Sequence, residues 1–309
     1  VILSAGLTPA WQQILVFDRF RLGEVNRAAE VHWCASGKVF NAGIAAHHLG
    51  AESLALALAG GPPLAEIRAE MRALGVPLEV VETASATRVC TTVLDRSCGA
   101  ITELVENGRA VSEAELDAFW QAMAAAARRA EAVVLIGTLP AGAPQTYYRR
   151  LLECVSAPAV LDFRGQGLIG TLDLEPCVVK PNREELAQTV GRPLDTDDEL
   201  VEAMRSLNDR GARWVVVTDG PRAVWLSGRG ELYRFQPPAV PAEDAVNPIG
   251  CGDAMAAALA WAMRDGRSLP EAVRLGIGAS IDNLRQLLPC RLNPQRVRRI
   301  AEMVESRAM

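Results

Sequence analysis

The chain alternates short, continuously apolar segments with longer segments whose apolar residues recur at helical spacing. The apolar segments include Ser53–Ala59, Ala132–Leu139 and Trp214–Thr218. They lack the alternation of polar and apolar residues expected of a strand with one face in water. Apolar strands separated by amphipathic helices are typical of a parallel sheet that is covered on both faces. The sequence therefore predicts a doubly wound α/β fold with a mainly parallel sheet.

Capping and stop signals set the expected helix boundaries. Ser112 with Glu115, and Thr196 with Glu199, have the spacing of a capping box. The expected helices are Gly37–His48, Leu64–Leu74, Ser112–Arg129, Pro144–Val155, Asn182–Val190, Thr196–Asp209, Cys251–Arg264, Leu269–Leu288 and Pro294–Ser306. The other expected strands are Val1–Gly6, Leu78–Glu82, Ala159–Asp162 and Cys177–Lys180, with a hairpin of Ala223–Leu226 and Glu231–Phe235.

Two segments depart from this rhythm. Gln12–Cys34 and Thr87–Val105 alternate polar and apolar residues and contain turn signals, such as Ser97-Cys98-Gly99 in the second. Such segments read as antiparallel strands inserted into the α/β unit. We expect a single domain over residues 1–309, with a small lid sheet formed by insertions at about 10–35 and 87–106.

Composition excludes several classes of protein. The net charge of −5 and the absence of a basic tract argue against a nucleic-acid-binding surface. The seven cysteines are scattered without a C-x-x-C pair, so neither a zinc site nor a disulfide framework is expected. No run of 18 apolar residues suggests a membrane span, and Val1–Leu7 is too short for a signal peptide. Reduced thiols in the cytoplasm are the simplest expectation.

The segment Asn247–Asp253, which opens the apolar helix Cys251–Arg264, carries the strongest chemical signal. Gly250 and Gly252 let the backbone turn tightly and approach a ligand. The unpaired N–H groups of a helix start attract an anion. A carboxylate at this place can take a proton from a hydroxyl while the N–H groups hold a phosphoryl group. An acid in the first helical turn also has a plain structural reading, because it complements the helix dipole.

Further motifs occur in a fixed order along the chain. They are Leu7-Thr8-Pro9-Ala10, Gly23–Arg27, Ser36-Gly37-Lys38 with Asn41, Thr87-Arg88, Thr102-Glu103-Leu104, Gly137–Pro140, Lys180-Pro181-Asn182 with Glu185, Thr218-Asp219-Gly220 and Gly250–Asp253. In this order and at these spacings the chain resembles the PfkB-type carbohydrate kinases of the ribokinase-like fold. The resemblance covers essentially the whole chain and is strongest to the branch of 1-phosphofructokinases and tagatose-6-phosphate kinases.

The resemblance implies an ATP- and Mg²⁺-dependent kinase that phosphorylates a ketohexose monophosphate. Asp253 would be the catalytic base, with Gly250, Cys251 and Gly252 as the anion hole. The residues implied for the acceptor are Gln12, Arg27, Ser36, Gly37, Lys38, Asn41 and Arg88. Three of these, Lys38, Arg27 and Arg88, would clamp a phosphate already present in the acceptor.

A second group of residues is implied for the nucleotide and its metal ion. It consists of Lys180, Asn182, Glu185, Thr218, Gly220, Asn247 and Asn283. Asn182 and Glu185 are one helical turn apart and would organise Mg²⁺ through water. The same pair also fits an ordinary helix N-cap. Asn247 and Asn283 would flank the nucleotide, or else serve as plain loop and helix polar residues.

Three positions depart from the family pattern. Gln12 stands where the family has an aspartate that holds acceptor hydroxyls, and Ser36 and Val39 replace two glycines. These changes suggest a shifted acceptor or a weak kinase. At the anion hole Cys251 replaces an alanine. It is either a small apolar filler or a thiol whose pKa is lowered at a helix start.

Two other functions remain open from the sequence. One is a kinase of an unphosphorylated sugar or nucleoside, and the other is a sugar-phosphate sensor that has lost catalysis. The resemblance further implies a homodimer formed through the lid, for which Trp11 and Trp33 suit either an interface or the sugar pocket.

Overall fold

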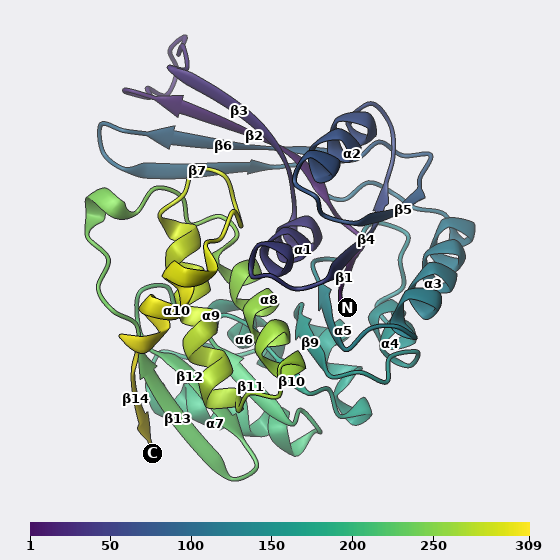
Figure 1. Cartoon of the computed structure of the whole chain (residues 1–309), viewed down its shortest axis with the longest axis vertical. Helices are drawn as coiled ribbons and strands as arrows, with labels where there is room; N and C mark the ends of the chain where they lie inside the picture. The colour runs from purple at the N-terminus through teal and green to yellow at the C-terminus, as the bar shows by residue number, and fades with distance from the viewer.

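A ten-stranded sheet forms the centre of the computed structural model, which describes residues 1–309 (Figure 1). All neighbouring strands from β5 to β11 are parallel, whereas β12, β13 and β14 are antiparallel additions at one edge. The spatial order is β14 (Glu305–Ala308), β13 (Glu231–Gln236), β12 (Val224–Gly228), β11 (Trp214–Val217), β10 (Val178–Val179), β9 (Ala159–Asp162), β8 (Ala132–Ile136), β1 (Ile2–Gly6), β4 (Ser53–Ala59) and β5 (Leu78–Glu82). The prediction of a mainly parallel sheet is confirmed.

Helices cover both faces of this sheet, which explains why its central strands are apolar throughout. In β8, Val134 and Ile136 pack into one layer while Val133 and Leu135 pack into the other. The first layer contains α1 (Lys38–His48), α2 (Pro63–Ala73), α8 (Cys251–Arg264), α9 (Leu269–Leu284) and α10 (Pro294–Glu302). The second contains α3 (Glu113–Ala127), α4 (Tyr147–Leu152), α5 (Gln166–Ile169), α6 (Arg183–Val190) and α7 (Asp197–Asp209).

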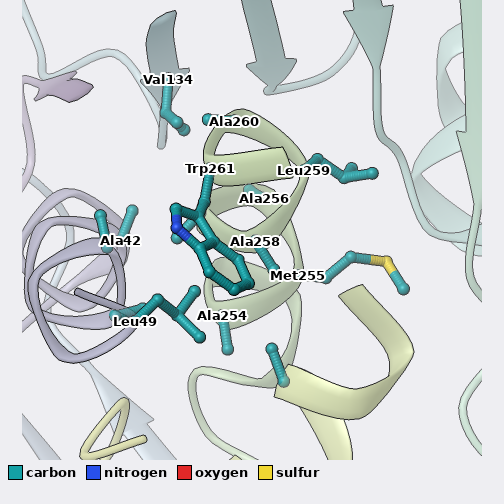
Figure 2. Packing of buried hydrophobic residues seen from close by; sticks show 14 of the residues in the cluster. Ala42, Leu49, Val134, Ala254, Met255, Ala256, Ala258, Leu259, Ala260 and Trp261 are labelled. Atoms are coloured by element: carbon teal, nitrogen blue, oxygen red, sulfur yellow. The ribbon is translucent and has the colours of Figure 1, made fainter. Parts of the chain in front are cut away.

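The central helix of the first layer, α8, is rich in alanine and almost completely buried. Its small side chains let α1 and α9 approach closely; a Cβ on Gly276 of α9 would lie 2.9 Å from Met255. Figure 2 shows Trp261 filling the space between α8 and α1, beside Ala42 and Leu49. Tight packing along its length holds the first turn of α8 in a fixed position relative to the sheet.

The two inserted segments form a separate four-stranded lid sheet, drawn above the rest of the molecule in Figure 1. Its order is β3 (Glu30–Ser36), β2 (Ala10–Phe17), β6 (Arg88–Asp95) and β7 (Ala100–Val105). β2 is antiparallel to β3 but parallel to β6. The expected lid sheet is therefore confirmed, but the expectation that all its strands are antiparallel is wrong, because the central pair β2 and β6 is parallel.

The structure corrects several expected boundaries. The helix expected over Pro144–Val155 is only Tyr147–Leu152, and α9 ends at Leu284 because Leu287 and Leu288 turn to pack beneath the lid. The last helix ends at Glu302 and is followed by β14, which was not expected. All four residues of β14 are exposed and three of them are polar, so no apolar pattern marks them as a strand. None of the helices combines the length and apolar character needed to cross a bilayer.

Candidate active site

The turn before α8 has the geometry expected of an anion-binding loop. Gly250 adopts a left-handed conformation with φ of 87°, and a Cβ there would lie 3.1 Å from Cys290 Sγ. The backbone N–H groups of Gly252 and Asp253 donate to no acceptor within the protein. A Cβ placed on Gly252 would lie 3.5 Å from Lys180 Nζ, so an ammonium group accompanies these donors. Free N–H groups and a cation together suit a phosphoryl group.

Asp253 lies in the first turn of α8 with only 6% of its surface exposed. Asn41 Nδ2 donates a hydrogen bond to Asp253 Oδ2 at 2.8 Å, and Ser36 Oγ donates to Asn41 Oδ1 at 3.2 Å. Burial raises the pKa of the Asp253 carboxyl to about 6, although Lys38 acts in the opposite direction. A carboxylate with a raised pKa, held by an amide, suits a general base that works near neutral pH.

Two lysines and two acids form a charged cluster beside Asp253. Asp162 Oδ1 is 2.9 Å from Lys38 Nζ, and Asp162 Oδ2 is 3.0 Å from Lys180 Nζ. Lys38 also lies 3.3 Å from Glu185 Oε1. Burial alone would raise the pKa of Asp162, but Lys180 and Lys38 outweigh it and hold that pKa below its ordinary value. Burial disfavours the Lys38 ammonium, yet Asp162, Glu185 and Asp253 outweigh it and raise its pKa.

Asn182 and Glu185 form the N-cap of α6. Asn182 Oδ1 accepts a hydrogen bond from Glu185 N at 2.7 Å, and Glu185 Oε2 accepts from Asn182 N at 3.0 Å. These two hydrogen bonds are those of an ordinary helix N-cap, so the capping interpretation of this pair is correct. Glu185 Oε1 still points toward Lys38, outside the capping box. The structure gathers no group of three or more His, Cys, Asp or Glu side chains that could hold a metal ion by themselves.

The residues implied for the nucleotide differ in exposure: Gly220 lies in an open loop, whereas Lys180 is buried. Gly220, with φ of 55°, has no atom within 4 Å of the position of a Cβ, so the loop after β11 is open at this point. Arg183 N donates to Thr218 O at 2.9 Å, and its guanidinium bonds Asp219 at 3.1 Å. These bonds join the start of α6 to the Thr218–Gly220 loop. Lys180 is buried in the charged cluster.

Asn247 and Asn283, which the resemblance places beside the nucleotide, are both fully buried. Asn247 donates to Leu287 O and accepts from Ile249 N. Asn283 donates to Ile249 O at 2.9 Å and accepts from Cys290 N at 2.6 Å. Because both amides form hydrogen bonds with the surrounding backbone, they support the turn that precedes α8.

The environment of Cys251 excludes a reactive thiol. Its Sγ donates to Ser280 O at 3.2 Å and receives a hydrogen bond from Asn283. Burial raises the pKa of this thiol to about 11. The hypothesis of a lowered pKa is wrong, because loss of solvent outweighs the effect of the helix start.

The residues implied for the acceptor include Gln12 and Gly37, which lie where β2 and β3 of the lid join the main sheet. Gln12 is buried and donates through Nε2 to Thr92 Oγ1 at 2.7 Å. Gly37 has φ of 80°, and a Cβ there would lie 2.8 Å from Ala10 N, so glycine is required at this crossing. Val39 is buried in α1, and a Cβ placed on Gly6 would lie 3.0 Å from its Cβ.

The two arginines of the expected clamp have different surroundings. Arg88 donates to the carbonyl oxygens of Thr8, Pro9 and Glu106, which uses its guanidinium to join lid and main sheet. Arg27 is exposed in the connection between β2 and β3, beyond the end of the lid remote from Gln12. Within one chain, Arg88 therefore lies at the junction of lid and main sheet, whereas Arg27 lies at the opposite end of the lid.

Two residues at the site were not predicted from the sequence. Asp162 is the last residue of β9, at the carboxyl edge of the sheet. Ligands bind at this edge in open α/β folds, so its position after an apolar strand could have identified it from the sequence. Arg164 follows two residues later, with Nη1 4.0 Å from Glu185 Oε1. No motif marked either residue.

Known proteins of similar structure share the whole architecture. Phosphofructokinase-2 from Escherichia coli in complex with fructose-6-phosphate superposes with a TM-score of 0.86 at 23% identity, over 98% of this chain and 99% of that one. A Thermotoga maritima protein described as a possible 1-phosphofructokinase gives 0.91 at 19% identity, over 100% and 99%. The model of the pfkB family of carbohydrate kinases matches residues 8–281. The chain therefore belongs to the pfkB family of carbohydrate kinases.

Proposed function

We propose that this protein transfers the γ-phosphoryl group of ATP to a hydroxyl of a ketohexose monophosphate, giving a bisphosphate. The observation that carries the proposal is the position of Asp253. Its carboxylate is held by Asn41 at 2.8 Å, next to the free N–H groups of the α8 start. Proton acceptor and anion site are thus adjacent, as transfer to an alcohol requires.

Each group has a definable task in this reaction. Asp253 accepts the proton of the attacking hydroxyl. The N–H groups of Gly252 and Asp253, with Lys180 beside them, stabilise charge on the phosphoryl oxygens. Lys38 lies between the carboxylates of Asp162 and Glu185 and adds a second cation. Phosphoryl transfer depends mostly on positioning and charge stabilisation, which these groups provide.

The residues present fit a magnesium ion bound together with the nucleotide. Mg²⁺ usually keeps several waters and binds through one or two carboxylates plus substrate phosphates. Glu185 Oε1 lies outside the capping box, while Asn182 and Asp162 supply further oxygen atoms nearby. Glu185 would hold the ion through water, and the ion would neutralise phosphate charge during transfer.

A phosphorylated acceptor is supported by the kind of protein this chain resembles and by the cationic site. Both structural relatives named above carry phosphofructokinase descriptions. Gln12 in the acceptor region, buried and bonded to Thr92, would alter which sugar is preferred. All seven cysteines are free, which fits action in the reducing cytoplasm.

The outer face of the lid supports a homodimer. Trp33, Gln13, Thr91 and Leu104 form one cross-strand row, so Trp33 and Leu104 share a face. They are 43% and 58% exposed, and Trp11 stacks on Trp33 with ring centroids 5.9 Å apart. An exposed apolar sheet face of this kind suits burial against a second copy. Light scattering should give twice the chain mass for the parent and one chain mass for Trp33→Glu.

The test of the proposed reaction is ATP turnover with Mg²⁺ and a panel of acceptors. The panel comprises fructose 1-phosphate, fructose 6-phosphate, tagatose 6-phosphate and the corresponding free sugars. Turnover of a sugar phosphate that disappears in Asp253→Ala supports the proposal. Turnover of free sugars alone would replace it with the second kinase function. Binding of a sugar phosphate in a thermal-shift assay, without any turnover, would establish the sensor.

A further inference from the structure

A cavity of about 390 Å³ opens beside the charged cluster. Lys38, Arg164 and Glu185 are its charged lining residues. Its neutral polar lining includes Thr138, Gln145 and Gln166, and its remaining wall is Gly137, Leu139, Tyr148, Phe163, Gly165 and Gly167. Lys38 is paired with Glu185 at 3.3 Å and with Asp162 at 2.9 Å, so Arg164, 4.0 Å from its nearest acid, carries the more weakly compensated positive charge of this cavity.

The backbone that carries Arg164 is anchored on both sides. Before it, Asp162 is held by two lysines, and Phe163 stacks on Tyr148 with ring centroids 4.1 Å apart and planes 9° apart. After it, Gly165 N donates to Thr189 Oγ1 at 3.0 Å. The position of the Arg164 Cα is therefore fixed by the fold rather than left to a free loop.

The guanidinium of Arg164, in contrast, is not committed to a partner. Its closest acid is Glu185, at 4.0 Å, and it forms no hydrogen bond within the protein. Arg88, by comparison, donates to three backbone carbonyl oxygens. Arg164 thus presents an unoccupied planar fork of donors to the cavity, a geometry that matches phosphate bidentately.

We propose that Arg164 and Lys38 form a phosphate subsite in this cavity, which holds a phosphate group of a bound reactant during transfer. The subsite rests on the proposed function, because that function supplies the phosphate-bearing reactants. The shared chemistry is a phosphate monoester or anhydride, so the group belongs either to the sugar phosphate or to ATP. Arg164 would add a cation beside Lys38 to the cations that the resemblance implies for the phosphate clamp.

The test compares Arg164→Gln with the matched control Arg205→Gln, an exposed arginine of α7. KM and kcat are measured with the sugar phosphate varied and, separately, with MgATP varied. We expect Arg164→Gln to raise one of these two KM values about 10- to 100-fold, as loss of a charged hydrogen bond does. The reactant whose KM rises identifies the source of the phosphate. Arg164→Lys should recover part of the loss, and Arg205→Gln should match the parent.

The proposal is overturned if both KM values of Arg164→Gln stay within about threefold of the parent. It is also overturned if the KM for an unphosphorylated sugar rises as much as that for the sugar phosphate. If the parent turns over no acceptor, the proposed function fails on its own. Phenylglyoxal labelling then tests the subsite: MgATP or inorganic phosphate should protect Arg164 but not Arg205, and equal labelling of Arg164 with and without them refutes it.

Discussion

Asn41 and Asp253, which are 212 residues apart in the sequence, are joined by a hydrogen bond of 2.8 Å from Nδ2 to Oδ2. The bond connects α1, which follows the lid strand β3, to the first turn of α8. It occupies Oδ2 and is the one hydrogen bond of the Asp253 side chain within the protein. The pair therefore joins the helix that follows the lid to the turn that carries the free N–H groups of Gly252 and Asp253.

The pH dependence of activity should follow the Asp253 carboxyl. Burial raises its pKa to about 6, and the base works only when deprotonated. We expect kcat/KM to be level above this pH and to fall about tenfold per unit below it. The Asn41 hydrogen bond favours the carboxylate, so Asn41→Leu should move the inflection to higher pH. A profile that stays flat from pH 5 to 8 would contradict this assignment.

Asp253→Asn should lower kcat about 10²- to 10⁴-fold and yet stabilise the fold at pH 8. The carboxyl has a higher pKa in the folded chain, about 6, than its ordinary value of 3.8. The folded state therefore binds more protons between these values, and stability decreases as pH rises through them. Above pH 6 the buried Asp253 charge lowers the free energy of unfolding by its full amount, about 3 kcal/mol.

Urea unfolding at pH 8 and pH 4 measures this stability effect. The gain from Asp253→Asn should be about 2–3 kcal/mol at pH 8 and should shrink toward zero at pH 4. A variant that is less stable than the parent at pH 8 would show that the buried charge is better compensated than its pKa indicates.

Gly250→Ala should abolish most activity. The left-handed φ of 87° disfavours alanine, and the new Cβ would lie 3.1 Å from both Cys290 Sγ and Pro289 Cβ. The anion-binding turn would have to shift, at a stability cost of about 1–3 kcal/mol. Gly266→Ala is the matched control, because Gly266 has φ of 72° with no atom within 4 Å. It should lose about 1 kcal/mol of stability and keep full activity; equal activity loss in both would refute a local role for Gly250.

Gln12→Asp should change acceptor preference. The Gln12 amide donates to Thr92 at 2.7 Å in a buried position, whereas aspartate is shorter, charged and cannot donate. We expect the ratio of kcat/KM between two acceptors of the panel to shift by about tenfold or more. Identical ratios for variant and parent across the panel would show that Gln12 does not face the acceptor.

Iodoacetamide at pH 7.5 should leave activity intact. Burial raises the pKa of Cys251 to about 11, so almost none of this thiol is in the reactive thiolate form. Cys98, which is exposed in the turn between β6 and β7, serves as the internal control and should be labelled first. Mass spectrometry of the labelled peptides gives the extent of labelling at Cys251 and at Cys98. Inactivation in step with labelling of Cys251 would contradict the buried environment.

Apolar patterning and local chemistry determined the architecture from the sequence alone. Strands such as β8 are apolar throughout because both faces are covered, and the lid strands alternate because one face is not. The capping boxes at Ser112, Asn182 and Thr196 start helices where the sequence predicts, since their bonds span only three residues. The Gly250–Asp253 turn likewise carries its own signal.

The direction and partners of single side chains were decided only by the tertiary structure. Asp162 becomes the centre of the site because Lys38, 124 residues before it, packs against the same edge of the sheet. Asn283 turns inward to bond Ile249 and Cys290, whereas spacing alone allowed it to face a ligand. The strand β14 exists because β13 offers an unpaired edge, not because its own residues favour a strand. Burial and pairing between residues far apart in the sequence decide these outcomes, and neither can be predicted from the neighbouring residues in the sequence.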